Sequence, residues 1–284
     1  MPHRSDVVLL YDGSFDGFLS AVFVSYLHRP APLSIEPQDG VQQQFEITYL
    51  SVETDDEQAQ RTADGIRRTM GQDAYETVWK AFLSESVGSS AALYRYIRFG
   101  MRIGRTVVHS LTTACVAEVN ALALRLTNEV GHLIQFVRFS RLDGGIYYAA
   151  IDPKGFVLPL LMPHFAARYQ IQPFLLHDRT HQTVGVFDTH EWVLADASSL
   201  RLPDFAAEET AWRRLWKAFY ESIAIRERQN LRLQMQHVPL RYRSCMIEML
   251  PNYAQDFALH GPAGDPSCEI GAAAAEHVQK MSKL

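Results

Sequence analysis

The feature that most constrains the fold is a short apolar stretch near the N-terminus that ends abruptly in two Asp-Gly steps. Val7–Tyr11 is continuously apolar, and the next six residues read DGSFDG. Such a run predicts a buried strand, and the Asp-Gly steps predict a tight loop. Residues 19–27 continue with apolar residues at helical spacing. We therefore expect a strand, a loop and a helix, the arrangement in which α/β proteins place ligand-facing groups.

The middle of the chain is predicted to be helical, and strands are predicted after it. Residues 33–44 contain proline, glycine and several glutamines, which indicates a loop before a short strand at residues 45–52. From residue 57 to about residue 131, apolar residues recur at helical spacing. Aromatic and β-branched residues then predict a hairpin around an Asp-Gly-Gly turn, a helix and three more strands. Their expected ranges are 134–142 and 145–151, then 156–169, then 174–177, 183–188 and 192–195.

This order of elements predicts an α+β protein. It combines an α/β-like N-terminal strand-loop-helix, central helices, an antiparallel sheet crossed by a helix, and C-terminal helices. The last helical part opens at Pro203 and carries an apolar stripe made of Trp212, Leu215, Trp216, Phe219 and Ile223. We expect an N-terminal region at residues 1–75 and a core at residues 76–250. A flexible C-terminal tail is expected at residues 251–284, where a glycine- and proline-rich linker precedes an alanine-rich end.

Composition limits the functions that the chain can support. The formal net charge of -5 repels a phosphate backbone, so any binding of nucleic acid must come from a local basic patch. The three cysteines form no CxxC pair. Their spacing argues against a zinc ribbon or a cysteine-held iron–sulfur cluster, and their odd number fits a reducing compartment. Because no apolar run approaches the ~20 residues that span a bilayer and no signal-peptide pattern is present, we expect a cytoplasmic protein without membrane contact.

A row of arginines stands on one face of the helix expected at residues 93–105. At about 100° per residue, Arg95, Arg98, Arg102 and Arg105 share an arc of about 80°. Apolar residues and two glycines, which permit close packing, lie roughly opposite. Arginine forks match phosphate oxygens, so the row is a candidate for contact with a nucleic-acid backbone. The alternative is a solvated or salt-bridged face, but the helix itself contains no carboxylate that would neutralise the row.

A second basic segment lies near the end of the predicted core. Its arginines are Arg226, Arg228, Arg232, Arg241 and Arg243. His237 and Tyr242 are interleaved with them, and basic side chains beside aromatic rings suit single-stranded or distorted nucleic acid, whose bases can stack. A charged surface without a ligand is the alternative. The two basic segments support each other only if the fold brings them to one face.

The loop after the first strand is the candidate catalytic site. Two carboxylates beside glycines can hold Mg²⁺ or act as a base, so Asp12, Ser14 and Asp16 would carry the chemistry. The alternative is that Asp12 or Ser14 simply caps the helix. His164 is a further catalytic candidate, although a histidine beside an apolar helix is more often semi-buried and structural. The chain lacks Walker, GxGxxG and GxSxG motifs, which argues against the commonest NTPases, dehydrogenases and hydrolases.

Several segments resemble blocks of a known bacterial family. They are LYDGSFDGF at residues 10–18, ALYRYIRFG at 92–100, VRF at 137–139, LPLLMPHF at 158–165 and IAIRERQN at 223–230. In this order they are similar to a family of DNA repair or DNA metabolism proteins that contains a domain of unknown function numbered 4130. The resemblance extends over residues 7–249. It identifies residues 76–250 as a core like that domain and leaves the tail outside the match.

The resemblance implies a connection with DNA. Members of the family resemble partners of a radical-SAM protein described as DNA-modifying, and related domains look fused to uracil-DNA-glycosylase-like domains. The present chain has no CxxxCxxC triad, so it cannot hold the radical-SAM cluster itself, and we expect no cofactor. The family supplies no catalytic residue that can be carried over to this sequence.

The function that we expect is a DNA-binding accessory protein in DNA repair or base modification, with DNA and the radical-SAM protein as partners. The two basic segments would contact phosphates, and Arg138 and Arg141 on the hairpin would add to them. One alternative is a Mg-dependent enzyme that processes a nucleotide or a nucleic acid at the loop containing Asp12 and Asp16. Another alternative is a scaffold that binds the protein partner without contacting DNA.

Overall fold

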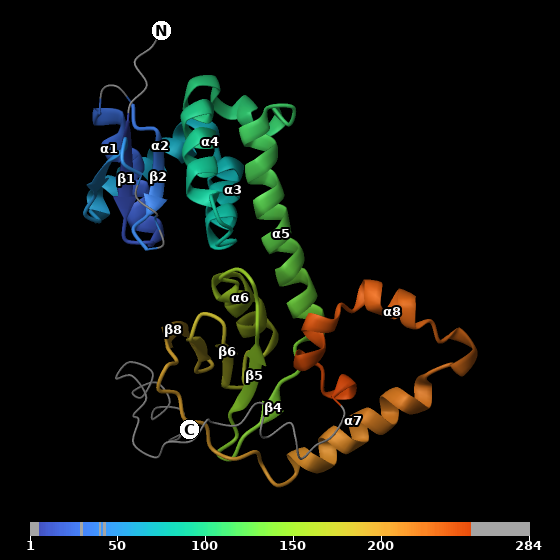
Figure 1. Cartoon of the computed structure of the whole chain (residues 1–284). Coiled ribbons are helices and arrows are strands. Elements are labelled where there is room, and N and C mark those ends of the chain that lie inside the picture. Colours follow the sequence, from blue (N-terminus) through green and yellow to red (C-terminus); the bar gives the residue numbers. More distant parts are fainter. Residues whose placement is uncertain (1–5, 29–30, 40, 42–43, 251–284) are drawn as a thin grey trace. The chain divides into compact units, whose positions relative to one another are not determined.

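The structure is a computed structural model that describes residues 6–28, 31–39, 41 and 44–250. The tail expected at residues 251–284 lies outside the described residues. Helices occur together with one parallel and one mixed sheet, which confirms the predicted α+β class. The chain divides into two compact units, unit 1 at Met1–Asn128 and unit 2 at Glu129–Leu284, and Figure 1 shows the elements of each.

The strand, loop and helix predicted near the N-terminus are present as β1 (Val7–Tyr11) and α1 (Phe15–Leu27). β1 is the central strand of a three-stranded parallel sheet, between β2 (Ser34–Pro37) and β3 (Thr48–Ser51). The interpretation of residues 33–44 as a loop is wrong for β2, because Ile35 is fully buried and pairs with Leu9. The proline and glutamines around this single core residue concealed the strand.

The helices of unit 1 pack against this sheet and against one another. Asp55 caps α2 (Asp56–Met70), because its side chain accepts a hydrogen bond from the backbone N–H of Gln58. The close packing expected at the α4 glycines is confirmed for Gly100, where an added Cβ would lie 2.2 Å from the terminal methyl of Met70. The helical elements are α2 (Asp56–Met70), α3 (Gln72–Leu83), α4 (Ser89–Ile103), the 3-10 helix η1 (Gly104–His109) and α5 (Ala114–Phe136).

Unit 2 begins within α5 and contains a five-stranded sheet in the order β4-β5-β6-β7-β8. The expectation of an antiparallel sheet is wrong for one pair, since β5 and β6 run parallel while the other neighbours are antiparallel. α6 (Leu158–Arg168) joins β5 to β6, and a helical crossover of this kind connects parallel strands. The strands are β4 (Ser140–Arg141), β5 (Tyr147–Ile151), β6 (Phe174–Asp178), β7 (Thr183–Phe187) and β8 (Trp192–Asp196).

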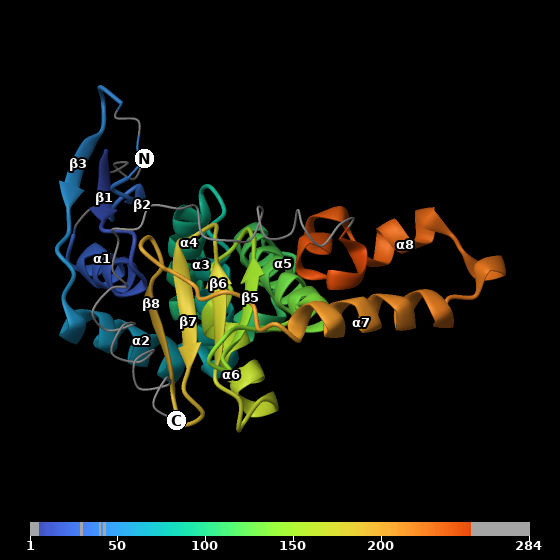
Figure 2. The ribbon, with the colours of Figure 1, turned by 90° about the horizontal axis from the view of Figure 1, so that it is seen from below.

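The last described part of unit 2 is helical, and Figure 2 shows α7 and α8 extending away from the five-stranded sheet. Two buried carboxylates hold α7 in place. Glu209 accepts a hydrogen bond from the backbone N–H of Arg141 at 3.0 Å, and Glu248 accepts one from the indole N–H of Trp216 at 3.0 Å. The elements are α7 (Glu209–Ile223), η2 (Arg226–Arg228), α8 (Leu231–His237), η3 (Leu240–Cys245) and η4 (Ile247–Met249).

No single helix in the described part of the chain has both the length and the apolar character that crossing a membrane requires. Ser89–His109 and Ala114–Phe136 meet the length and composition criteria only when they are taken together, and they are bent by 63° relative to each other. Both contribute buried residues to the core of unit 1, for example Leu93 and Leu122.

Two candidate nucleic-acid interfaces

The predicted row of arginines borders a groove in unit 1, which we call the α4 groove. It encloses about 790 Å³ and is lined by residues from α1, α4 and the start of α5. Arg95, Arg98 and Arg102 belong to the lining, whereas Arg105 lies on η1 outside it. The aromatic residues of the lining are Tyr26, Tyr94 and Phe99. The groove therefore combines guanidinium groups and aromatic rings in one surface of unit 1.

Two of these arginines lie over aromatic rings. The guanidinium carbon of Arg98 is 4.7 Å from the ring centre of Tyr26, and that of Arg102 is 5.9 Å from the ring centre of Phe99. A cation–π contact positions a guanidinium without neutralising its charge. No carboxylate pairs with either arginine among the residues that the structure describes. These two positions therefore keep the positive charge that binding to phosphate requires.

The other arginines of the row are placed differently. Arg95 pairs with Glu118 of α5 at 3.0 Å, and both side chains are about half exposed. At this position the alternative of a salt-bridged face holds, because a neighbouring helix supplies the acid that α4 itself lacks. Exposed pairs of this kind contribute at most about 1 kcal/mol, so a phosphate can displace Glu118 at little cost. Arg105 is exposed on η1.

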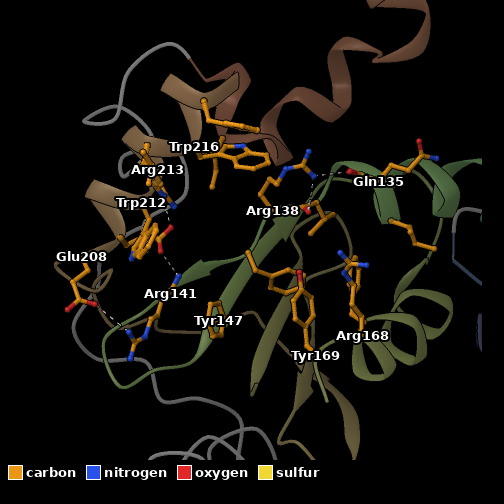
Figure 3. A pocket seen from close by; sticks show the side chains of 18 of the residues that line it. Gln135, Arg138, Arg141, Tyr147, Arg168, Tyr169, Glu208, Trp212, Arg213 and Trp216 are labelled. Atoms are coloured by element: carbon orange, nitrogen blue, oxygen red, sulfur yellow. Dashed lines mark hydrogen bonds and ion pairs between the residues drawn. The ribbon is translucent and has the colours of Figure 1, made fainter. Parts of the chain in front are cut away.

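A larger cleft lies in unit 2, and we call it the α7 cleft. It encloses about 1220 Å³. Figure 3 shows Trp212 and Trp216 of α7 along one side, with Tyr147 and Tyr169 across from them. Tyr147 belongs to β5, and Tyr169 directly follows α6. The helix therefore forms one wall of the cleft, and the sheet together with α6 forms the other.

Arg138 and Arg141, which the sequence placed on one hairpin, both line the α7 cleft. The strand expected at residues 134–142 is wrong before Ser140, because α5 extends to Phe136, and only Arg141 lies on a strand. Arg138 pairs with the buried carboxylate of Glu248 at 2.9 Å, and its guanidinium carbon lies 5.8 Å from the ring centre of Trp216. Arg141 pairs with Glu208 at 3.5 Å, and both side chains of that pair are well exposed. Arg138 is thus fixed in position, whereas the exposed pair of Arg141 is exchangeable.

Two further arginines complete the basic lining of the α7 cleft. Arg213 pairs with Glu209 at 3.1 Å and donates a hydrogen bond to the hydroxyl of Ser140 at 2.7 Å, so it fastens α7 to β4. Arg168 is exposed at the end of α6. No ion pair involves Arg168 within the described ranges of the chain. Arg168 is therefore the cation of this cleft whose charge is not already matched by a carboxylate.

The aromatic side of α7 is exposed and forms part of the lining of the α7 cleft. Trp212, Trp216 and Phe219 are 64%, 40% and 51% exposed, although an apolar stripe on a helix normally packs into a core. Sequence reasoning treated these rings as a packing stripe and did not single out Arg168 or Arg213. Arg213 directly follows Trp212, but adjacent residues of a helix point about 100° apart, so no local signal marked the two as parts of one site.

A comparison with protein-family models matches residues 87–248 to a domain of unknown function, DUF4130, which is more than half of the 284-residue chain. The chain belongs to the DUF4130 family. The DUF4130 region contains the whole lining of the α7 cleft and the α4 and α5 parts of the α4 groove. A search of curated proteins gave no match.

The second basic segment of the DUF4130 region is partly structural. Arg241 pairs with Glu129 at 3.1 Å, a buried carboxylate that also accepts the backbone N–H groups of residues 154 and 155. Tyr242 is buried and stacks on His132, with ring centres 5.1 Å apart. The expected use of Tyr242 as a platform for bases is therefore wrong, because its ring packs inside unit 2.

The remaining arginines of this segment have different surroundings. Arg228 and Arg232 are exposed on η2 and α8. The Nε of Arg243 is buried and has no hydrogen-bond partner among the residues that the structure describes. The side chain of Arg226 lies outside the described residues. The structure thus gathers Arg95, Arg98 and Arg102 in the α4 groove of unit 1, and Arg138 and Arg141 in the α7 cleft of unit 2.

The loop after β1 shows the capping arrangement that was the alternative to catalysis. The Ser14 hydroxyl oxygen accepts a hydrogen bond from the Gly17 backbone N–H at 2.9 Å, so Ser14 caps α1. Ser14 also donates to one oxygen of Asp12 at 2.6 Å, and Thr54 donates to the other at 2.8 Å. These hydrogen bonds, that from Ser14 above all, lower the pKa of Asp12, which makes it a poorer base at neutral pH. Asp16 is exposed in the first turn of α1.

Two histidines of unit 2, His164 and His177, have different surroundings. His164 is exposed in the lining of the α7 cleft, so the expectation that it is semi-buried is wrong. His177 on β6 is largely buried, and its Nδ1 lies 3.0 Å from the hydroxyl of Tyr148. Burial, followed by the positive charge of Arg179, lowers the pKa of His177. No group of three or more histidine, cysteine, aspartate and glutamate side chains suited to a metal ion is found in the described part of the chain.

Proposed function

We propose that this protein is a DNA-binding accessory factor in DNA repair or base modification and that it acts with a radical-SAM partner. The observation that carries the DNA-binding part is the α4 groove, where Arg98 and Arg102 rest on aromatic rings instead of carboxylates. The partner and the process are supported by the resemblance of the sequence blocks to DNA repair or DNA metabolism proteins.

Whether a guanidinium can bind phosphate depends on the group that already contacts it. A guanidinium carries its N–H donors in a plane that matches the oxygens of a phosphate. When an aromatic ring supports the guanidinium from one face, those donors stay available at the edge. A chain with a net charge of -5 repels a polyanion at long range, so binding depends on a local surface where uncompensated guanidiniums are grouped.

The test is the affinity of the full chain for a fluorescently labelled duplex of about 20 base pairs, measured by anisotropy at low salt. Replacing Arg98 and Arg102 together with glutamate should reduce the affinity by at least about tenfold, because two attractive contacts become repulsive. The matched control replaces Arg61 and Arg68 with glutamate. Both are exposed on α2, outside the groove, and Arg61 also lies over an aromatic ring, that of Phe23.

The control variant has the same net charge as the test variant and should keep most of the affinity. If both double variants bind the duplex equally well, the α4 groove is not the DNA-binding surface. The partner part of the proposal predicts that the radical-SAM protein is co-purified with this chain after nuclease treatment. Co-purification without any binding of DNA would favour the scaffold alternative.

A further inference from the structure

We propose that the α7 cleft binds a short stretch of single-stranded DNA, with bases stacked on the exposed rings of α7 and phosphates on Arg168 and Arg141. This surface shares no residue with the α4 groove. The proposed binding of DNA by the α4 groove and the proposed binding of a single strand by the α7 cleft can therefore be tested independently. The choice of DNA over RNA rests on the function proposed above. The choice of a single strand rests on the cleft itself.

The dimensions of the cleft suit an extended ligand. Its volume of about 1220 Å³ exceeds the range of about 300–1,000 Å³ that is usual for small-molecule pockets. Figure 3 shows aromatic side chains on both sides, with Trp212 and Trp216 opposite Tyr147 and Tyr169. An unpaired base exposes both faces of its ring system, and such a ring fits between two aromatic walls. A duplex keeps its bases stacked inside and cannot use these walls.

The rings of α7 are held ready for stacking. Trp216 donates its indole N–H to Glu248, which fixes the orientation of the ring. Glu209 accepts the backbone N–H of Arg141, and Arg213 donates to the hydroxyl of Ser140. These two polar contacts anchor the same helix to β4. Because these buried polar contacts hold the helix, its aromatic face need not pack into the core. Aromatic side chains on a positioned scaffold give sequence-tolerant stacking of successive bases.

The charges of the cleft favour a polyanion over a protein segment. The lining contains the four arginines Arg138, Arg141, Arg168 and Arg213 and the carboxylates of Glu208 and Glu209. Because Glu248 pairs with Arg138 from just outside the lining, the charge of Arg168 remains in excess. Arg168 directly precedes Tyr169, so a cation and a ring adjoin on the wall opposite α7. An apolar protein helix laid against the tryptophans would offer Arg168 no counter-charge. A nucleic-acid strand supplies a ring and a phosphate at each residue.

The experiment measures the binding of labelled oligo-dT of about ten nucleotides, a probe without base pairing, to the full chain. Trp212→Ala and Arg168→Glu should each weaken binding about tenfold. Trp212→Phe should retain most of the affinity, because it keeps an aromatic face. Arg214→Glu is the matched control for Arg168→Glu, since Arg214 is exposed on α7 outside the cleft lining. Circular dichroism confirms that each variant is folded.

The outcome of each binding measurement shows which ligand occupies the α7 cleft. Support requires that Trp212→Ala and Arg168→Glu lose oligo-dT binding while Trp212→Phe and Arg214→Glu retain it, whether or not the α4 groove binds a duplex. Equal binding of oligo-dT by all variants overturns the proposal. Binding of thymidine monophosphate as tight as that of oligo-dT makes the cleft a mononucleotide site and also overturns it. Tighter binding of oligo-rU overturns the choice of DNA. Loss of the protein partner by Trp212→Ala, with unchanged oligo-dT binding, makes the cleft a protein-docking site instead.

Discussion

The α4 groove and the α7 cleft are built from the same residue types but join them in opposite ways. In the α4 groove, Arg98 and Arg102 lie over rings and keep their charge. In the α7 cleft, Arg138 and Arg213 are matched by buried carboxylates, while the ring of Trp212 stays open. The first arrangement suits the proposed contact with a phosphate backbone, and the second suits the proposed stacking of bases. Composition alone therefore does not tell which part of a nucleic acid such a surface contacts.

The acids that accompany the arginines also differ in their surroundings. Glu118, at the α4 groove, has a side chain that is 49% exposed, whereas the side chain of Glu248 at the α7 cleft is 2% exposed. An exposed pair is screened by water and contributes little to stability. A buried carboxylate that loses its charge leaves its partner uncompensated, which is costly. The α4 groove should therefore tolerate substitutions that the α7 cleft does not.

The largest expected effect comes from removing these acids. Glu248→Gln should lower the free energy of unfolding by about 3 kcal/mol, because Arg138 loses its partner and the contact with Trp216 is weakened. Glu118→Gln should lower it by less than about 1 kcal/mol. Urea denaturation of both variants measures the difference. Equal losses in the two variants would contradict the contrast between a buried and an exposed acid.

An intermediate effect is expected in the salt dependence of binding. Arg98→Gln combined with Arg102→Gln should reduce the slope of log affinity against log salt for a duplex by about 2, since each phosphate contact contributes about 0.9. Trp212→Ala should weaken the binding of oligo-dT without changing its slope, because stacking releases no counterions. Anisotropy titrations at several salt concentrations give both slopes. A change of slope in Trp212→Ala would show that its ring acts by positioning a cation.

The smallest expected effect is a pH dependence of the stability of unit 2. The pKa of His177 is lowered from 6.5, so the folded state disfavours its charged form. Stability is therefore full above about pH 6.5 and declines as the pH falls below it, because the unfolded chain then binds a proton that the folded chain does not. His177→Gln keeps an acceptor for the Tyr148 hydroxyl and should flatten this decline, by at most about 1.4 kcal/mol per pH unit.

The free energies of unfolding at about pH 7.5 and 5.5 measure this effect. His164→Gln, the same substitution at an exposed position in the α7 cleft, is the control. A decline that is equally steep in wild type and His177→Gln would assign the acid sensitivity to other groups.

The parts of the molecule that depend on local sequence were predicted well. The apolar run and the Asp-Gly steps predicted β1 and α1, and helical spacing predicted that Leu93 and Ile97 are buried opposite the arginines. Close packing at Gly100 was also anticipated. These features arise from periodicity and backbone preference within a few residues, and such short-range signals are readable without knowledge of the fold.

The features that depend on distant parts of the chain were not predictable in this way. Glu118 is 23 residues from Arg95, and Glu248 is 110 residues from Arg138, so periodicity within one helix does not reveal either pair. The exposed stripe of α7 is compatible with the fold because Trp216 and Arg213 make polar contacts with distant residues, Glu248 and Ser140. The pattern of the helix itself does not reveal these contacts. The parallel pairing of β5 with β6 depends on the path of the chain through α6. Tertiary contacts therefore determined the ion-pair partners, the exposure of α7 and the direction of the strands, none of which the local sequence pattern specifies.

The anchoring of Trp216 by Glu248 has a consequence for biosynthesis. Ribosomes make the chain from its N-terminus, so Arg138 and Trp216 emerge well before the glutamate that holds them. Until η4 has been synthesised and has docked, α7 lacks one of its two polar anchors. A nascent or prematurely terminated chain that stops before Glu248 would therefore hold its aromatic helix only through the contacts of Glu209 and Arg213 with β4. A loosely held aromatic helix is the kind of surface that chaperones and proteases recognise.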